Sequence, residues 1–536
     1  MVNNEQDKKG SLREQSAWLL FAKMVGFGFS FVLPLMIVRY LTRDEVGHYR
    51  EAFQVITNAV VILPLGFSMS AYYYLARERE KRARAILNIL LFNFVVGGIA
   101  CLFLYLYPSS IGGIFKSDEL TRLAPLIGLV IWIWIFSTFL ETVAVANQEA
   151  RVATVFIISA QVSKTLLMGG AVLTFATVEA FLYAAIAQGI IQSFFLFNYL
   201  RSRFPGYWRS FDAGFFWEQM RYAVPFGLAG ILWIAQTDIH NYFAGNAFSS
   251  ADFAIYAYGC FEVPLIAMLS ESVTSVLIPR MNALHQAGDR QEMIRLTARA
   301  MQKLAFFYFP IYVFLFITAQ TFIITLFTKN FEASASVFVI NLTLLPFSIL
   351  ITDPIIRSFK ELGRLFLLVR TLILVVLVAI LYLWLDRLGM TGIIGVAVAA
   401  IIVEKFVAEA MVIAKLRVEI GQVRLLLPIA KTAFASAVAG VVTYFVYWGA
   451  KDTLYGFGEH FVEDVLHAHQ MSVINFLSGG LVLLISGIVF ALIYLAAADL
   501  LRLIEDDEKE ILRSFVRRYI SRSASRQNQT EGGAAL

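Results

Sequence analysis

The sequence LTRDEVGHY, residues 41–49, is a polar turn between two apolar runs that are each long enough to cross a membrane. The same order of features returns in FSSADFAIY, residues 248–256: an apolar residue, a polar turn, an acid, an apolar residue, a small residue and a tyrosine. Apolar runs of span length flank this second copy as well. The repeat predicts a chain of two halves built on one plan.

A second repeated feature, a small residue followed by arginine, supports this duplication. Ala150-Arg151 closes the fourth apolar run, and Gly363-Arg364 follows the tenth. Helical transporters with alternating access are commonly built from internal repeats, because one half can rock against the other about a site between them. The pattern therefore favours a membrane transporter.

The composition excludes an ordinary soluble protein. Of the 536 residues, 59% are hydrophobic and 15% are charged, and the mean hydropathy is +0.70, whereas soluble domains carry about 25% charged residues. The two cysteines, Cys101 and Cys260, fall inside apolar runs and are expected to be small buried residues. The first fifteen residues are polar and show no cleavage signature, so we expect the first span to be retained as a signal anchor.

The apolar runs predict an all-α, polytopic inner-membrane protein with about 14 transmembrane helices. A helix needs about 20 apolar residues to cross the hydrocarbon, and charged or Gly/Pro turns bound such runs. The expected spans are residues 16–41, 49–76, 86–107, 121–146, 152–174, 180–200, 222–244, 253–281, 301–327, 335–358, 365–385, 391–414, 430–449 and 472–498.

The distribution of basic residues orients these spans. With both termini cytoplasmic, the inside segments hold thirty of the Lys and Arg residues, whereas the outside loops hold five. Basic loops are retained on the cytoplasmic side. We therefore expect a multi-pass protein of the bacterial inner membrane with both ends inside.

The domain organisation follows from the repeat. We expect two pseudo-symmetric six-helix bundles, residues 1–200 and 222–414, joined by a cytoplasmic linker, residues 201–221. Residues 415–498 hold two extra spans with an external loop, 450–471, and residues 499–536 form a cytoplasmic amphipathic and disordered tail. Pro225 is expected to break or kink the seventh span near its start. His460, His467 and His469 lie in the loop, but apolar residues at helical spacing favour a surface helix there over a metal site.

Nine basic residues remain in or beside the expected spans: Lys23, Arg39, Arg50, Arg122, Lys164, Arg280, Arg357, Arg370 and Lys405. Side chains near span ends can reach the interface. Four of the nine, Lys23, Lys164, Arg370 and Lys405, lie roughly 8 to 18 Å from the nearest end. A lone cation there costs at least ~2.5 kcal/mol, so each should face a polar cavity or a partner. Lys23, Arg370 and Lys405 lie towards the inside together with Arg280 and Arg357, which suits an anionic substrate.

Acidic residues are embedded too: Glu141, Asp238, Glu262, Glu271, Asp353, Glu404 and Glu409. Lys405 and Glu409 are spaced to pair on one helix. Asp238, Glu262 and Glu271 have no basic neighbour at that spacing. Together with Glu404 they are candidates for ion or proton coupling, or for neutralising bases on other helices.

Several activities lack a signature. The chain has no phosphate-binding G-x-x-x-x-G-K-[ST] motif and no H-E-x-x-H or G-x-S-x-G motif, so we expect no built-in ATPase, no hydrolytic enzyme, no cofactor and no metal. The net charge of +5 comes from short loops beside spans and does not indicate nucleic-acid binding. Energy would come from an ion gradient, the membrane potential or the substrate's own gradient.

Three stretches carry a resemblance to a known family: SAWLL (16–20), VRYLTRDEVGHY (38–49) and AVPFG (223–227). The chain resembles the polysaccharide repeat-unit flippases of the multidrug/oligosaccharidyl-lipid/polysaccharide exporter superfamily. The resemblance implies two six-helix bundles around a V-shaped cavity. It also implies transport of undecaprenyl-diphosphate-linked oligosaccharides, such as O-antigen, capsule or exopolysaccharide units, across the bacterial inner membrane.

On this resemblance, the candidates for binding the substrate diphosphate are Lys23, Lys164, Arg280, Arg357, Arg370 and Lys405. Membrane lipids, a polysaccharide polymerase and other export machinery are the expected partners. Three alternatives stay open. A lipid II flippase also has fourteen spans, but PLGFSM (64–69) lacks the arginines typical of that branch; a multidrug exporter is expected to have an acidic cavity; and a membrane polysaccharide polymerase or ligase would need a larger outside loop than residues 450–471.

Overall fold

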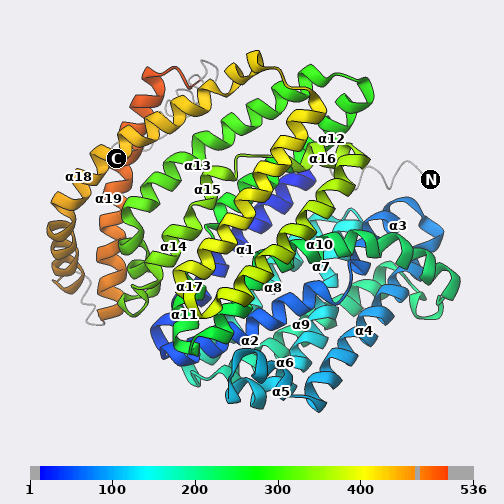
Figure 1. The fold of residues 1–536 in the computed structure, drawn as a ribbon. Coiled ribbons are helices and arrows are strands. Elements are labelled where there is room, and N and C mark those ends of the chain that lie inside the picture. The colour runs from blue at the N-terminus through cyan, green and yellow to red at the C-terminus, as the bar shows by residue number, and fades with distance from the viewer. Residues whose placement is uncertain (1–11, 465–470, 505–536) are drawn as a thin grey trace, which may run out of the picture.

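The computed structural model describes residues 12–464 and 471–504, and this part of the chain contains helices and no strand (Figure 1). In the first half the α-helices are α1 (Leu12–Tyr40), α2 (Arg43–Ile62), α3 (Ala71–Arg77), α4 (Arg82–Leu106), α5 (Ser109–Phe115), α6 (Asp118–Ser137), α7 (Phe139–Ala146), α8 (Ala150–Thr174) and α9 (Val178–Arg203). They continue with α10 (Ala213–Ala247), α11 (Ser250–Gly259), α12 (Pro264–Ala287), α13 (Arg290–Phe327), α14 (Ser334–Leu342), α15 (Leu344–Phe347), α16 (Asp353–Ser358), α17 (Lys360–Leu416), α18 (Leu427–Asp464) and α19 (Met471–Leu500). Short 3-10 helices are η1 (Phe67–Ser70), η2 (Arg79–Lys81), η3 (Tyr207–Arg209), η4 (Lys329–Phe331) and η5 (Ile420–Leu426).

The order of these elements repeats. A long helix (α1), a broken helix (α2, η1 and α3), another long helix (α4), a short helix (α5), a broken helix (α6 and α7) and two long helices (α8 and α9) make the first series. The second series is α10, then α11 with α12, then α13, η4, α14 to α16, and the two arms of α17, which meet at Gly389 with φ of 59°. The packing repeats as well, because α1 lies on α8 as α10 lies on α17, and α2 lies on α6 as α11 lies on α14. A duplicated six-span unit would give this arrangement.

The repeated polar turn works as a helix-capping signal in both halves. The Thr42 side chain accepts a hydrogen bond from the Glu45 backbone N–H at the start of α2, and the Glu45 side chain completes a capping box. Ser249 caps α11 in the same way, through the Asp252 N–H. Capping satisfies N–H groups that lack partners in the first turn of a helix. Each turn therefore ends one membrane-length helix and starts the next.

Four expected spans are interrupted, and their prediction as continuous helices was wrong. The fourth span is divided at Thr138 into α6 and α7. Leu65 and Gly66, with φ of 49° and 71°, lie between α2 and the η1–α3 segment. The axes of these two segments differ by 42°. The eighth span breaks between Gly259 and Pro264, and the tenth is divided among α14, α15 and α16. Proline disfavours helical conformation in the residue before it, which explains the break ahead of Pro264.

The described helices confirm an all-α, multi-pass membrane protein. Eight helical segments are long and apolar enough to cross a membrane, or up to nine if the bent pair of α2 with η1 and α3 counts as one span. The 57 residues of α17 contain both the eleventh and the twelfth expected spans. The count of fourteen spans stays a prediction, as does the cytoplasmic position of both termini.

The expected linker and the C-terminal region differ from their predictions in detail. Helix α9 ends at Arg203 and α10 begins at Ala213, so much of residues 201–221 is helical. Pro225 lies inside α10 without interrupting it, so a break at this point is wrong, whereas a kink stays a prediction. Helix α18 continues to Asp464 and includes His460. His467 and His469, and the amphipathic tail from residue 505, lie outside the described residues, within which no group of His, Cys, Asp and Glu is arranged for a metal.

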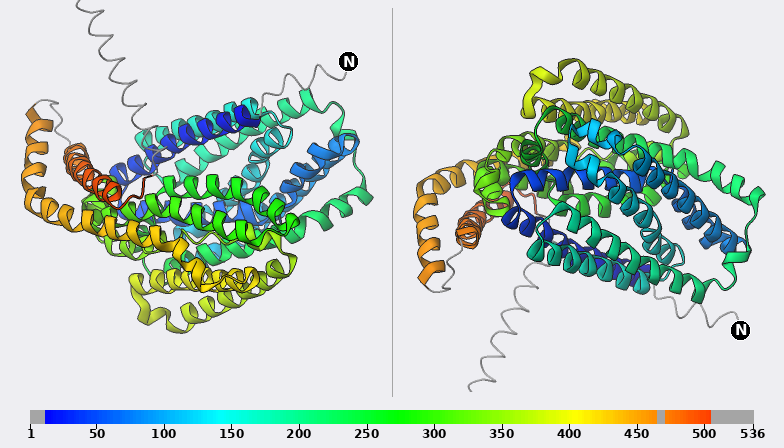
Figure 2. Two further views of the ribbon diagram at one scale, coloured as in Figure 1. Left: turned by 90° about the horizontal axis from the view of Figure 1, so that it is seen from above. Right: turned by 90° about the horizontal axis from the view of Figure 1, so that it is seen from below.

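The two extra helices form a layer at one edge of the molecule (Figures 1 and 2). Helices α18 and α19 pack on each other and on α13. Their contacts include a hydrogen bond of 2.8 Å from the Tyr494 hydroxyl to the Phe306 carbonyl and one of 2.5 Å between the Thr321 and Tyr447 hydroxyls. They therefore extend mainly the C-terminal half, and α19 also reaches α1 where Phe476 lies against Arg39.

Candidate functional site

The two halves meet along a seam that the predicted topology places at the outer side. We call outer seam the contacts of α1, α2 and α5 with α10, α11 and α13. At its rim, the Arg39 guanidinium donates to the carbonyls of Leu326 (3.0 Å) and Thr325 (3.1 Å). The Asn246 amide donates to the Ile114 carbonyl at 2.8 Å. Arg39 and Asn246 each lie two residues before a copy of the repeated turn, so these are equivalent contacts made in opposite directions.

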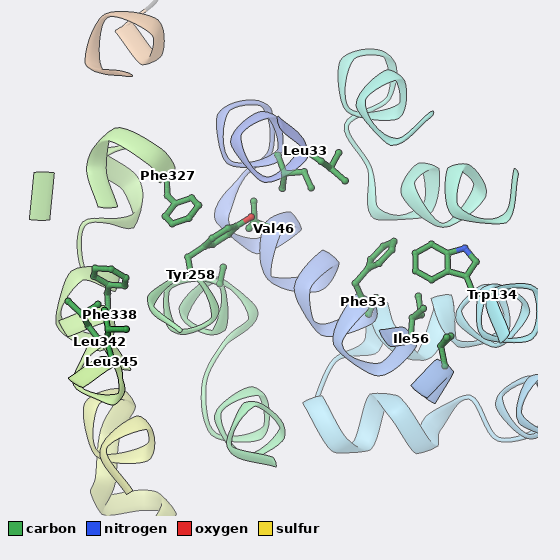
Figure 3. Close-up of a cluster of buried hydrophobic side chains, with 14 of the residues drawn as sticks. Leu33, Val46, Phe53, Ile56, Trp134, Tyr258, Phe327, Phe338, Leu342 and Leu345 are labelled. Atoms are coloured by element: carbon green, nitrogen blue, oxygen red, sulfur yellow. The ribbon is translucent and has the colours of Figure 1, made fainter. Parts of the chain in front are cut away.

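Helix α2 is the centre of the outer seam. Figure 3 shows it between Tyr258 and Phe327 of the second half on one side and Trp134 of the first half on the other. A Cβ added at Gly47 would overlap the Ser250 carbonyl, so only glycine permits this approach of α2 to α11. The close packing explains why both copies of the turn lie at the same level.

Polar contacts continue down the outer seam below Gly47. The Gln54 amide donates to the Asp238 carboxylate at 3.1 Å, and the Asn58 amide donates to the Tyr242 hydroxyl at 3.2 Å. The Arg50 guanidinium lies 5.3 Å from the centre of the Tyr258 ring. Polar side chains facing each other inside a membrane protein commonly mark pathways or switching contacts.

Two of the four coupling candidates come together at this seam. Asp238 lies on α10, and Glu262 lies in the break between α11 and α12, close enough for their charges to interact. Glu271 lies further along α12, at an exposed position. Glu404 lies elsewhere, on the second arm of α17. The role of each in coupling stays a prediction.

Glu404 forms a buried ion pair with Arg370 across the α17 hairpin. The Arg370 guanidinium donates to the Glu404 carboxylate at 2.6 and 3.2 Å, and the side chains are 16% and 6% exposed. The guanidinium also lies 4.9 Å from the Trp233 ring centre and 4.7 Å from that of Phe366. Arg370 is thus neutralised by the protein itself, which was one of the alternatives left open for the embedded acids.

Lys405 and Lys164 have no such counter-ion. The expected pairing of Lys405 with Glu409 is wrong for this structure, because within residues 12–464 and 471–504 Lys405 makes no ion pair. The Lys164 ammonium, on α8, lies 5.2 Å from the centre of the Trp134 ring and likewise has no acidic partner in the described part. Neither lysine therefore has a carboxylate within ion-pairing distance in the described part of the chain, and a substrate anion could occupy that place.

The remaining basic candidates differ in their surroundings. Arg280 is exposed on α12, without an ion pair among the described residues. The Arg357 guanidinium donates a hydrogen bond to the Asp353 carboxylate at 2.7 Å and forms an ion pair with it. Lys23 belongs to α1, and the position of its side chain is outside what the structure describes. The structure therefore separates unpaired cations from paired ones, a distinction the sequence does not contain.

At the inner side, the first turns of α10 belong to the N-terminal half. The Gln219 amide donates to the Ser70 hydroxyl at 2.7 Å, and Arg84 pairs with Asp212 at 3.0 Å. Lys81 contacts the carboxylates of Glu78 and Glu218, which raise its pKa. The first turns of α10 are therefore attached to the N-terminal half, and its later turns pack on α17 and also contact α2 and α5.

Comparison with known proteins decides the family. A family model described as "Polysaccharide biosynthesis protein" matches residues 36–336, which is more than half of the chain. The chain belongs to this family. No curated protein sequence matches it significantly.

Solved structures agree on the fold of this polysaccharide biosynthesis protein. The lipid II flippase MurJ, in an inward closed conformation, is similar at a TM-score of 0.61 and 15% identity, over 89% of this chain and 98% of MurJ. An inward-facing multidrug resistance MATE family transporter of the MOP superfamily gives 0.58 and 16% identity, over 73% and 94%. A MOP superfamily transporter from Pyrococcus furiosus gives 0.54 and 17%, over 78% and 97%. The fold is similar to that of these transporters, which confirms the all-α fold class expected from the sequence.

Proposed function

We propose that this protein is a flippase that moves an undecaprenyl-diphosphate-linked oligosaccharide across the bacterial inner membrane by alternating access. The family match, over a chain with the MOP fold, carries the proposal. The unpaired cations Lys164, Arg280 and Lys405 support it, because a diphosphate needs basic partners in a partly dry cavity. An ion gradient or the membrane potential would drive the cycle, with Asp238 and Glu262 as coupling groups.

The embedded lysines without an ion pair argue against a drug exporter. A cavity for organic cations would place acids, not unpaired lysines, inside the membrane. For the transporter from Pyrococcus furiosus, reversed polarity of the binding pocket suggests a different function. We infer that the lysines without an ion pair favour an anionic substrate in this chain.

Alanine variants test the substrate class. Lys164→Ala, Arg280→Ala and Lys405→Ala should each abolish or reduce surface polysaccharide at least about tenfold, because each loses a charge-assisted contact worth about 1.5–3 kcal/mol. Lys164→Arg and Lys405→Arg should keep part of the activity. The matched control is Arg357→Ala, which removes an exposed cation already paired with Asp353. Normal surface glycan in all three alanine variants would remove the cationic-cavity mechanism.

A lipid II flippase is the second candidate, favoured by the high coverage of the MurJ comparison. A transport assay in vesicles that contain the purified protein distinguishes the repeat-unit flippase from the lipid II flippase. Transport of a lipid-linked repeat unit without transport of lipid II supports the first proposal, and the opposite result supports the second. Uptake of an organic cation in place of both would assign a drug exporter.

We also propose that the protein lies in the inner membrane with both ends cytoplasmic. Cysteines placed at Lys116 and Lys451 should react with an impermeant maleimide added to intact cells, and a cysteine at Arg79 should not. The reverse pattern of labelling would invert the topology.

A further inference from the structure

A stripe of α2 faces the C-terminal half and contains one acid that the expected function does not use. Gly47, Glu51, Gln54 and Asn58 follow each other at intervals of four, three and four residues, which places them within about 60° on one helix face. Three of the four contact α10 or α11 as described above. Glu51 therefore lies in the same polar stripe of the outer seam.

Glu51 is fully buried, and half of its carboxylate lacks a partner. Its side chain is 0% exposed, and its Oε2 lies 3.3 Å from Nδ1 of His48. Its Oε1 makes no hydrogen bond within the described part of the chain. A buried, unpaired carboxylate oxygen is costly, unless a proton or another cation neutralises the group.

His48 connects this buried acid to the outer surface. Its side chain is 23% exposed, and its Nδ1 also lies 3.4 Å from the Ser117 hydroxyl at the start of α6. Histidine changes its charge near pH ~6.5, so it can take a proton from water and hold it beside a carboxylate. The pair has the composition of a proton site, because imidazole nitrogen is a base and sodium prefers several oxygen ligands.

The surrounding charges allow this assignment. Charged and titratable groups on the packed helices are Arg39 of α1, Glu119 and Arg122 of α6, Glu179 of α9, Asp238 and Tyr242 of α10, and Asp252 and Tyr258 of α11; Asp44, Tyr49 and Arg50 lie on α2 itself. Glu119 and Glu179 are both held by Arg122. Asp238 is hydrogen bonded to Gln54. Glu51 is thus the buried acid of the seam whose partner can itself gain or lose a proton.

We propose that His48 and Glu51 form a proton-binding site that holds the outer seam closed. The proton is taken from outer water as the seam closes and returns there as it opens. Loss of the proton from the closed state leaves a buried carboxylate without a cation, so a rise in outer pH favours opening. One linked proton changes the ratio of closed to open states by at most about tenfold per pH unit. This site involves no substrate contact and therefore stands apart from the proposed function.

Distance measurements across the seam test the site without any transport assay. Spin labels are attached at Lys116→Cys and Lys329→Cys, which lie at exposed outer positions of the two halves, in full-length protein whose Cys101 and Cys260 are replaced by alanine. The protein is studied in lipid nanodiscs from about pH 5.5 to about pH 8.5, on either side of the histidine pKa of about 6.5. The short-distance population should fall as pH rises, by up to about tenfold in its ratio to the long-distance population per pH unit.

Variants identify the proton site. Glu51→Gln, a neutral mimic of the protonated acid, should keep the seam closed at every pH. His48→Gln should shift the transition to lower pH or abolish it. Glu179→Gln is the matched control, because this acid is also paired with Arg122 but is not among the charges that act on His48, and it should leave the transition unchanged.

Three outcomes would overturn the proposal. The first is an absence of pH dependence in the parent protein. The second is a transition that survives in Glu51→Gln but is lost in Asp238→Asn, which would move the site to α10. The third is a response to sodium in place of potassium at constant pH that Glu51→Gln abolishes, which would assign a sodium site.

Discussion

The two halves hold an embedded cation on equivalent helices but treat it differently. Lys164 is on α8, which packs on α1, and Arg370 is on the first arm of α17, which packs on α10. Each cation lies against a tryptophan, Trp134 or Trp233. Only the C-terminal half adds a carboxylate, from Glu404. The same architecture therefore gives a self-neutralised cation in one half and an available one in the other.

Because of this difference, we expect Lys164 and Arg370 to have different roles, although both are embedded cations in the sequence. A neutralised, bidentate pair contributes to the packing of the α17 hairpin, whereas an unpaired lysine keeps its affinity for an anion. Both were expected to bind the substrate diphosphate. Variants that remove the counter-ion, the rim contacts or an exposed ion pair test whether the two halves differ in this way.

The largest effect is expected for Glu404→Ala. It leaves Arg370 charged and buried, which should destabilise the protein by about 3–5 kcal/mol. Thermal unfolding of the purified protein in detergent measures this loss. The double variant Arg370→Met/Glu404→Leu should recover most of the stability, because it removes both charges and fills similar space. If the double variant also loses transport while folding normally, Arg370 contacts the substrate and the distinction between the halves fails.

The equivalent rim contacts should differ in strength. Arg39→Ala removes two charge-assisted hydrogen bonds across the seam, one to Leu35 on its own helix, and a cation–π contact with Phe476 at 5.1 Å, and should cost about 1.5–3 kcal/mol. Asn246→Ala removes one neutral hydrogen bond and should cost about 0.5–1.5 kcal/mol. Both variants should raise the long-distance population between spin labels on Lys116→Cys and Lys329→Cys, Arg39→Ala more strongly. Equal shifts would show that the charge on Arg39 adds nothing to closure.

The smallest effect is expected for Arg357→Ala. Its partner Asp353 is on the same short helix, and the two side chains are 63% and 48% exposed. Exposed pairs of this kind contribute about 0–1 kcal/mol. Stability and surface polysaccharide should both stay near the parent values. A strong loss of export would return Arg357 to the substrate-binding set.

The fold class could be predicted because its signals are local. Hydropathy marks each membrane-length run, and Thr42 and Ser249, which follow two of these runs, start the next helices with the same N-capping chemistry. The breaks inside spans were missed, although Gly66 after Pro64 and Pro264 after Val263 carry recognisable turn signals. Counting apolar residues does not separate one continuous helix from two short ones of equal total length.

The pairing of charges could not be predicted, because it depends on contacts between helices. Arg370 meets Glu404 only when α17 folds back at Gly389, whereas spacing along one helix pointed to Lys405 and Glu409. Glu51 lies directly after a polar turn and has no sequence feature of a buried acid. Its burial results from the approach of α11 at Gly47.

The attachment of α10 to both halves has a mechanical consequence. Its first turns are fixed to η1 and α4, and its later turns lie along α17. Because α10 is packed on both halves, rotation of one half relative to the other is expected to bend this helix. Pro225 has no N–H to donate, and Gly227 and Gly230 follow it, so the bend has a defined place where fewest backbone hydrogen bonds resist it.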